Sequence, residues 1–310
     1  MTGHTRSDKE KTKMKKFIVL GLLASFVSWQ FTGISHAGVP LNNLEGVGGI
    51  AFNPLAYLAN AGSKWKKEKP VSPEAAKPGA EKKAFNDYGL LENVSKPQVG
   101  AWYVRLPQAH VDWTALGTAF SLYDRMEVSY GWEAVAPHGG KTIYKNNVGT
   151  KFLLVPENAG DHKFIPAISI GGILKNTDYV PSGTKHVGVD AYLVATKLIK
   201  ETPLPVLLSG GLLATNSRTT GVFGYDHNYR FTWFANADLI VLKNLAVGYE
   251  YKQGAKFHGW HDADYQDIHA AWFINDKWTL VGAWVYAGAA KSAKEVGLGD
   301  GFTASLHYAF

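Results

Sequence analysis

The segment Tyr229–Leu239, YRFTWFANADL, is the clearest indication of the fold of this chain. Every second residue in it is apolar, and the residues between include Arg230 and Asp238, with Phe234 as the one exception. Side chains of a β-strand point alternately to opposite faces, so this period of two predicts a strand with one apolar and one polar face.

The same alternation recurs along the chain from about residue 99. It is clear in 125–134, 245–252, 265–274 and 302–310, and only partial in 143–155. We predict twelve strands, at 99–106, 111–121, 125–135, 143–155, 163–174, 186–200, 204–215, 228–241, 244–254, 265–275, 277–287 and 300–310. Their connections alternate between short turns and mostly longer loops rich in Gly, Lys, Asp or His, which is typical of outer-membrane barrels.

The aromatic residues distinguish a membrane barrel from a soluble sandwich. The chain has 33 Gly and 13% aromatic residues, and many Trp and Tyr lie on the apolar faces near strand ends, where interfacial girdles form. After residue 37 no segment has 18 consecutive apolar residues, so a membrane would be crossed by strands. We predict an all-β fold, an antiparallel transmembrane barrel over 98–310 with about 12 strands and 14 as the alternative.

The two faces of the predicted strands assign side chains to lipid or to the barrel interior. The membrane-facing aromatic residues are Tyr130, Trp132, Phe231, Trp233, Tyr249, Tyr251, Trp272, Tyr308 and Phe310. The candidates for lining the lumen have mixed charge, and they are Arg105, Arg125, Glu127, Glu133, Asp190, Arg230, Asp238, Glu250, Lys252, Asp267, His269 and His307. Such a lumen is either a hydrated pore or a closed interior joined by ion pairs, and twelve strands lie between filled and open barrels.

The amino terminus has the parts of a secretory signal peptide. Lys15 and Lys16 precede the apolar stretch 17–27, and a small-x-small ending predicts cleavage after Ala37, with Met14 as the start and 1–13 as an upstream extension. Residues 1–37 hold six of the 32 basic and two of the 26 acidic residues, so the remainder has a net charge of +2. Nucleic acid is therefore not indicated as a partner.

Two segments separate the leader from the barrel. Residues 38–62 are Gly-rich, and we expect them to lie inside or beneath the barrel as a plug, with an additional strand as the alternative. Residues 63–97 carry eight Lys, five acidic residues and four Pro with few apolar residues, a composition that predicts a flexible linker.

Signs of chemistry are weak in this sequence. His258 and His261 lie in a predicted loop at a spacing that matches no zinc pattern, and Ser305 and His307 share a strand face without a GxSxG motif. There is no Cys, and no phosphate-binding glycine motif is present. We predict no cofactor, no metal site and no catalytic residues, and a barrel hydrolase is the least favoured alternative.

The segment Leu41–Asn60, LNNLEGVGGIAFNPLAYLAN, together with the leader and the barrel pattern ending at Phe310, resembles an uncharacterised proteobacterial outer-membrane family described only as a domain of unknown function. The layout is also loosely similar to barrels associated with exopolysaccharide export. The resemblance implies an outer-membrane location and brings no reaction or catalytic residue with it.

These features predict a function in the bacterial outer membrane. The first hypothesis is a narrow pore or export-associated conduit for small polar solutes or polysaccharide, and the alternative is a plugged scaffold barrel of the cell envelope. The expected partners are membrane lipid and lipopolysaccharide, and the barrel assembly machinery, which would recognise the terminal Phe310.

Overall fold

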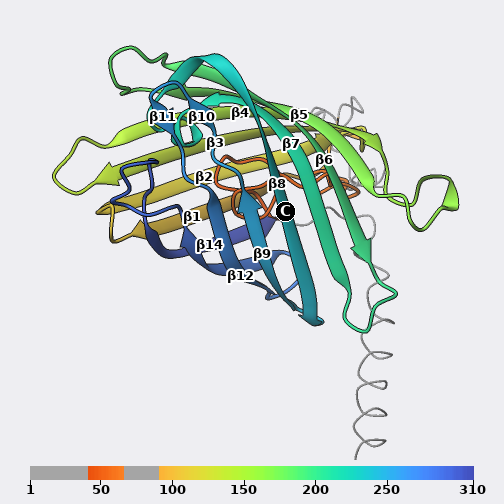
Figure 1. Ribbon diagram of the computed structural model, residues 1–310. Helices are drawn as coiled ribbons and strands as arrows, with labels where there is room; N and C mark the ends of the chain where they lie inside the picture. The colour runs from red at the N-terminus through yellow and green to blue at the C-terminus, as the bar shows by residue number, and fades with distance from the viewer. Residues whose placement is uncertain (1–40, 66–90) are drawn as a thin grey trace, which may run out of the picture.

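The computed structural model describes residues 41–65 and 91–310 and shows a closed antiparallel β-barrel (Figure 1). Twelve strands form the wall, which closes where β1 pairs with β14, so the predicted outer-membrane-type barrel and its strand count of 12 are confirmed. The wall strands are β1 Gln98–Leu106, β2 Val111–Leu122, β3 Met126–Pro137, β4 Ile143–Val155, β5 Ala167–Thr177, β6 Val187–Ile199, β7 Val206–Ser217, β8 Tyr225–Leu242, β9 Leu245–Lys252, β12 Tyr265–Phe273, β13 Trp278–Tyr286 and β14 Asp300–Ala309.

The two ends of the barrel differ in the length of their connections. One end, which we call the short-turn end, has the connections at 123–125, 156–166, 200–205, 243–244 and 274–277, and β1 begins and β14 ends there. The opposite end, the long-loop end, has those at 107–110, 138–142, 178–186, 218–224, 253–264 and 287–299. The 253–264 loop contains a small hairpin of β10 Lys256–Phe257 and β11 Trp260–His261, which the sequence pattern did not predict.

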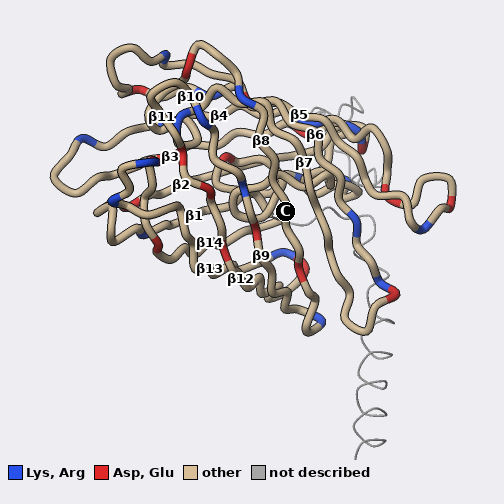
Figure 2. The backbone as a smooth tube through the Cα atoms, viewed as in Figure 1, with Lys and Arg blue, Asp and Glu red and all other residues tan. Residues whose placement is uncertain are grey.

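The outer surface of the wall is apolar. In β8 the outward residues include Phe231, whose side chain is 83% exposed, and Trp233, whereas the intervening Thr232, Phe234 and Asn236 are buried. In Figure 2 charged residues gather in the loops and turns, and long stretches of strand carry none. Because every backbone group of a closed barrel pairs within the wall, such a surface is suited to hydrocarbon.

Strand ends differ from the predicted ones by a few residues. The fifth strand begins at Ala167 instead of residue 163, because Ile165 donates its N–H to the His162 carbonyl in a turn and Pro166 has no N–H for a ladder. β8 starts earlier than predicted, at Tyr225, and its first residues extend beyond the pairing with β9, which begins at Phe234.

Residues 41–62, which we call the plug, enter the barrel and add no strand to the wall. All residues from 41 to 60 are buried except Phe52 and Tyr57, which are half-buried. Figure 1 shows this segment as an orange-red path enclosed by the strands. Within the described part of the chain, no helix is long and apolar enough to span a membrane.

Other regions assigned from the sequence fall outside the described residues. These are the leader at 1–37 and residues 66–90 of the proposed linker.

Candidate functional site

The plug enters and leaves the lumen at the same end of the barrel. Near its start, the Leu41 carbonyl accepts a hydrogen bond from Gln98 Nε2 (2.9 Å), and near its end Asn60 Nδ2 donates to the Lys96 carbonyl (2.9 Å). Gln98 is the first residue of β1, so both contacts lie at the short-turn end. The plug is therefore a loop inserted from one side, and it is not threaded through the barrel.

Gly46 allows the plug to lie directly against the wall backbone. Its φ of 87° is in the left-handed region, and a Cβ there would lie 2.5 Å from the Tyr130 carbonyl oxygen. On the wall, a Cβ at Gly117 would lie 2.8 Å from Gly46 Cα. Asn43 shapes this turn by accepting hydrogen bonds from the N–H groups of Glu45 and Val47 (both 3.1 Å).

Glu127 of β3 is the first polar anchor of the plug. Its carboxylate accepts hydrogen bonds from Gly48 N–H (2.9 Å) and Ala59 N–H (2.7 Å), and it pairs with Lys151 of β4 at 2.9 Å. The Lys151 ammonium also donates to the carbonyl groups of Gly48 and Leu55, each at 3.0 Å. The buried wall charges therefore satisfy plug backbone groups that would otherwise lack partners.

Glu250 of β9 anchors the other side of the plug. One carboxylate oxygen accepts hydrogen bonds from the N–H groups of Ala51 (3.0 Å) and Phe52 (2.8 Å). Asn53 then donates to the carbonyl of Tyr251 (3.1 Å) on the same strand. These contacts fix the inner bend of the plug to β9.

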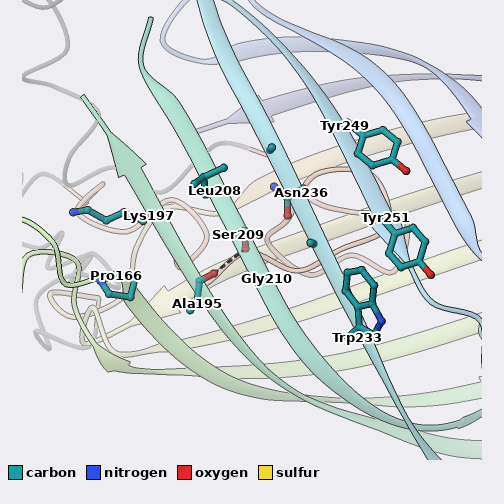
Figure 3. Close-up of a pocket in the computed structure, with 12 residues that line it drawn as sticks. Pro166, Ala195, Lys197, Leu208, Ser209, Gly210, Trp233, Asn236, Tyr249 and Tyr251 are labelled. Atoms are coloured by element: carbon teal, nitrogen blue, oxygen red, sulfur yellow. Dashed lines mark hydrogen bonds between the residues drawn. The ribbon is translucent and has the colours of Figure 1, made fainter. Parts of the chain in front are cut away.

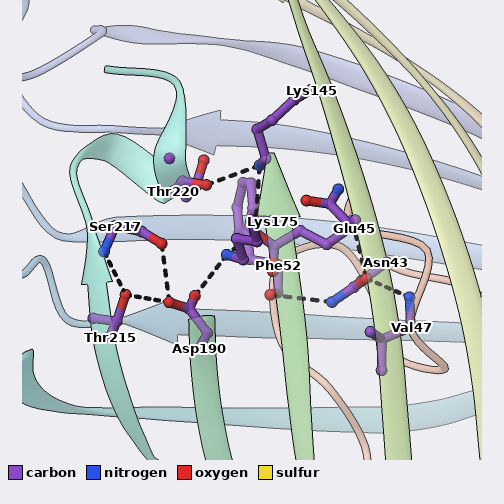
Figure 4. A network of polar contacts seen from close by, with 12 residues as sticks. Asn43, Glu45, Val47, Phe52, Lys145, Lys175, Asp190, Thr215, Ser217 and Thr220 are labelled. Atoms are coloured by element: carbon purple, nitrogen blue, oxygen red, sulfur yellow. Dashed lines mark hydrogen bonds and ion pairs between the residues drawn. The ribbon is translucent and has the colours of Figure 1, made fainter. Parts of the chain in front are cut away.

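Glu45 places the plug's only charge among lysines near the long-loop end (Figure 4). Its carboxylate pairs with Lys175 of β5, and it lies 3.5 Å from the ammonium of Lys145 of β4. Burial alone would raise the pKa of Glu45, but the ammonium groups of Lys175, Lys252 and Lys145 hold that pKa well below its usual range. Glu45 is therefore a stable anion inside the barrel.

Both lysines that touch Glu45 also have carboxylate partners on the wall. Lys175 pairs with Asp190 of β6 at 2.6 Å, and Lys145 pairs with Glu133 of β3 at 2.8 Å. Figure 4 shows Asp190 also accepting hydrogen bonds from Thr215 and Ser217 of β7. The network therefore continues across five neighbouring strands, from β3 to β7.

A second polar cluster lies on the wall formed by β8, β9 and β12. His269 is held between Asp267, at 2.7 Å from Nδ1, and Asp238, at 2.7 Å from Nε2. Asp267 lies directly across from Glu250 in the β9–β12 pairing. This side of the lumen carries three carboxylates and one lysine, Lys252, whereas β4 and β5 carry three lysines.

The long-loop end is narrowed by the 218–224 loop, which folds inward. Asp262 accepts hydrogen bonds from the N–H of Thr219 (2.9 Å) and from its hydroxyl (2.8 Å), and Lys145 donates to the Thr220 carbonyl (2.8 Å). Burial raises the pKa of Asp262. Beneath this loop a cavity of about 40 Å³ is lined by apolar residues such as Leu106 and Trp113 and by the charged residues Glu45, Glu133 and Lys252.

Nine of the twelve lumen candidates have buried side chains on the inner face of the wall. They are Glu127, Glu133, Asp190, Asp238, Glu250, Lys252, Asp267, His269 and His307. The aromatic residues assigned to lipid all lie on the outer face, exposed or half-buried, and they are Tyr130, Trp132, Phe231, Trp233, Tyr249, Tyr251, Trp272, Tyr308 and Phe310.

Three arginines expected in the lumen lie elsewhere. Arg105 is on the outer face of β1, where it pairs with Asp112 at 2.6 Å, because the inner positions there are apolar and pack in the core. Arg125 is exposed in the turn before β3. Arg230 is at the long-loop rim, where it donates to the Lys256 carbonyl (2.6 Å) outside the middle of the lumen.

Sequence reasoning missed Lys145, Lys151 and Lys175. In β4 the lysines alternate with outward residues, but polar residues such as Asn146 and Thr150 also face outward, so the pattern is weak. Lys175 fell one residue beyond the predicted end of its strand. Lys145 and Lys151 are an even number of residues apart and so share one face of the strand, which was the available signal that both point into the barrel.

Ser305 and His307 are close but are not arranged as a nucleophile and its base. The Asn42 N–H points at His307 Nδ1 (3.4 Å), so a neutral ring carries its proton on Nε2 and donates to Ser305 Oγ (2.8 Å). A serine nucleophile requires the reverse direction. In the loop considered for metal binding, Asp262 bonds Thr219, and the described residues contain no group of three metal-ligating side chains.

A separate concavity of about 600 Å³ opens on the outer wall (Figure 3). Small residues such as Gly210 and Ala235 form its floor, and the larger Leu208, Trp233 and Tyr251 surround them. The ring centroids of Trp233 and Tyr251 are 4.5 Å apart. The side chains of this apolar surface face outward with the rest of the lipid-facing wall, away from the plug.

Comparisons with solved structures find porins and an outer membrane channel at low sequence identity. The KdgM porin is 12% identical over 69% of this chain and 99% of its own, with a TM-score of 0.46. The NanC porin is 8% identical over 69% of this chain and 99% of its own, with a TM-score of 0.47. The COG4313 outer membrane channel from Pseudomonas putida F1 is 14% identical over 70% of this chain and 94% of its own, with a TM-score of 0.45.

Sequence comparison identifies the family. No curated protein matches the chain. A family model described as a protein of unknown function, DUF3034, matches residues 82–297, which include all of the wall strands except β14. The plug lies before the matched range. The chain therefore belongs to the DUF3034 family.

Proposed function

We propose that this protein is a narrow pore of the bacterial outer membrane for small polar solutes, and that the plug is its gate. The observation that carries the proposal is that the plug enters and leaves at the short-turn end. A loop inserted from one side can withdraw without breaking any wall strand. The leader at 1–37 would direct export, and the exposed Phe310 at the end of the chain would be presented to the assembly machinery.

The contacts between plug and wall support a reversible gate. Polar anchors such as Glu127 and Glu250 hold plug N–H groups. When the plug leaves, water and solutes can replace its N–H groups as hydrogen-bond partners, because the carboxylates of Glu127 and Glu250 are readily hydrated. The wall that remains has polar inward side chains on β3 to β9 and on β12, which a hydrated path requires, beside the apolar inner positions of β1.

The rival function is a permanently closed scaffold barrel of the cell envelope. It is favoured by the buried Glu127–Lys151 pair, since breaking such a pair costs about 3–5 kcal/mol. A scaffold keeps the plug in place at all times. Solute flux through the unmodified protein therefore separates the two functions.

An engineered disulfide between plug and wall provides the test. A Cβ at Gly149 of β4 would lie 3.1 Å from Val47 Cγ2 but would overlap Ser129 Oγ, so all variants are made in a Ser129→Ala background that removes this hydroxyl. Because the chain has no native Cys, Val47→Cys with Gly149→Cys can then form a single cross-link. In liposome swelling, the pore model expects the oxidised double variant to block glucose influx and a reductant to restore it. The two single variants are the matched controls and should respond to neither treatment.

The scaffold model expects no glucose influx through the wild-type protein or any of these variants, before or after reduction. That result would remove the pore proposal.

A further inference from the structure

The plug carries a single charged residue, and the structure gives that charge a specific binding place. Glu45 lies among three lysines of the wall, Lys145, Lys175 and Lys252, which we call the lysine trio. Every other contact of the plug with the wall uses backbone groups or uncharged side chains of the plug. The plug thus presents an anion at one defined point of the lumen.

Lys252 has no partner among the residues that the structure describes. It is the last residue of β9 and is only 8% exposed, yet within 41–65 and 91–310 its ammonium makes no hydrogen bond or ion pair. It lines the cavity of about 40 Å³ beneath the 218–224 loop, together with Glu45. A buried ammonium without a partner is costly, and a nearby anion relieves that cost.

The charge balance of this level of the lumen depends on the plug. With Glu45 present, three ammonium groups face three carboxylates, those of Glu45, Glu133 and Asp190. When the plug withdraws, Glu45 leaves with it, and three ammonium groups face only two carboxylates. The open lumen would then hold an uncompensated positive charge at the lysine trio.

We infer that the lysine trio binds the carboxylate of a permeating solute, and that Glu45 occupies this carboxylate site in the closed pore. The inference rests on the proposed pore function and adds the solute class, polar molecules that carry a carboxylate.

Glucose and glucuronate test the inference because they differ at a single carboxylate. In liposome swelling with the full chain, glucuronate influx should exceed glucose influx. Lys252→Gln should lower the ratio of the two rates by about tenfold, since a hydrogen bond to a charged group is lost, while Lys252→Arg should keep the ratio. Replacing Lys252 breaks no ion pair, so the barrel should fold.

Glu45→Gln provides an independent arm. It removes the anion of the plug but leaves the wall unchanged, so influx of both sugars should rise while the preference for glucuronate stays. An equal influx of both sugars in the wild type, or a ratio that is unchanged in Lys252→Gln, would overturn the carboxylate site. Absence of all influx would instead overturn the pore itself, so the two failures are distinguishable.

Discussion

At the scale of single residues, the plug is held by wall side chains that each serve several partners. Glu127 binds two plug N–H groups and Lys151, and Glu250 binds two further N–H groups. Close packing of the plug also requires glycine, because Gly46 and Gly117 allow the plug and wall backbones to come into contact. Charged wall side chains and glycines without a side chain therefore both hold the plug against the wall.

Lys151→Met should destabilise the protein by about 3–5 kcal/mol, because Glu127 would be left buried without its counter-ion. The double variant with Glu127→Gln should lose less than the sum of the two single variants. Urea unfolding in lipid vesicles, followed by Trp fluorescence, measures both effects. Additive losses would contradict the direct pairing of these two residues.

Gly46→Ala should loosen the plug, since the new methyl group would overlap the Tyr130 carbonyl and the φ of 87° disfavours alanine. We expect a loss of about 1–3 kcal/mol in plug binding. Thiol labelling of Val47→Cys reports it as faster modification. Gly282→Ala is the control, because a Cβ at Gly282 meets no atom within 4 Å, and it should leave the labelling rate unchanged.

At the scale of elements, strands were the most predictable part of the chain. The fourth strand was predicted at 143–155 and observed there, although its alternation was weak. The observed starts of β5 and β8 differ from the predicted ones by a few residues. They depend on the turn that contains Pro166 and on the pairing of Tyr225 at the rim, which the alternation of side chains does not report. A period of two reports which face a residue occupies, and it does not report where hydrogen bonding with the next strand stops.

The candidate site was less predictable than the strands. Alternation placed Glu127 and Glu250 inside the barrel, but their partners are backbone groups of residues 48–59, far away in sequence. Arg105 was misassigned because apolar residues face inward at that end of β1, where they pack in the core. Contacts of this kind follow from tertiary packing and leave no local pattern.

The 218–224 loop provides a prediction at this scale. Asp262→Asn should weaken the hydrogen bonds to Thr219, since an uncharged acceptor binds less strongly and the amide offers only one oxygen. Hydrogen–deuterium exchange at 219–224 should therefore become faster. Asp264→Asn is the control, because Asp264 bonds Tyr251 and Gly254 and makes no contact with this loop. Equal exchange in all three proteins would show that Asp262 does not hold the loop.

At the scale of the whole molecule, the apolar exterior implies that lipid surrounds the wall. Leu193 lies in the middle of β6 and faces outward, so Leu193→Arg should cost about 2–4 kcal/mol of folding free energy in a bilayer. Leu242→Arg, at the end of β8 beside the 243–244 turn, should cost only about 0–1 kcal/mol. Refolding titrations into lipid vesicles compare the two, and equal costs would contradict the bilayer placement.

Single-channel recording of one bilayer can show whether a removable plug closes a membrane pore. The oxidised Val47→Cys/Gly149→Cys protein, in the Ser129→Ala background, should be silent, and adding a reductant to the same bilayer should produce discrete current steps. Steps that are already present before reduction, or silence that persists after it although wild-type protein is inserted in parallel, would contradict the proposed gate.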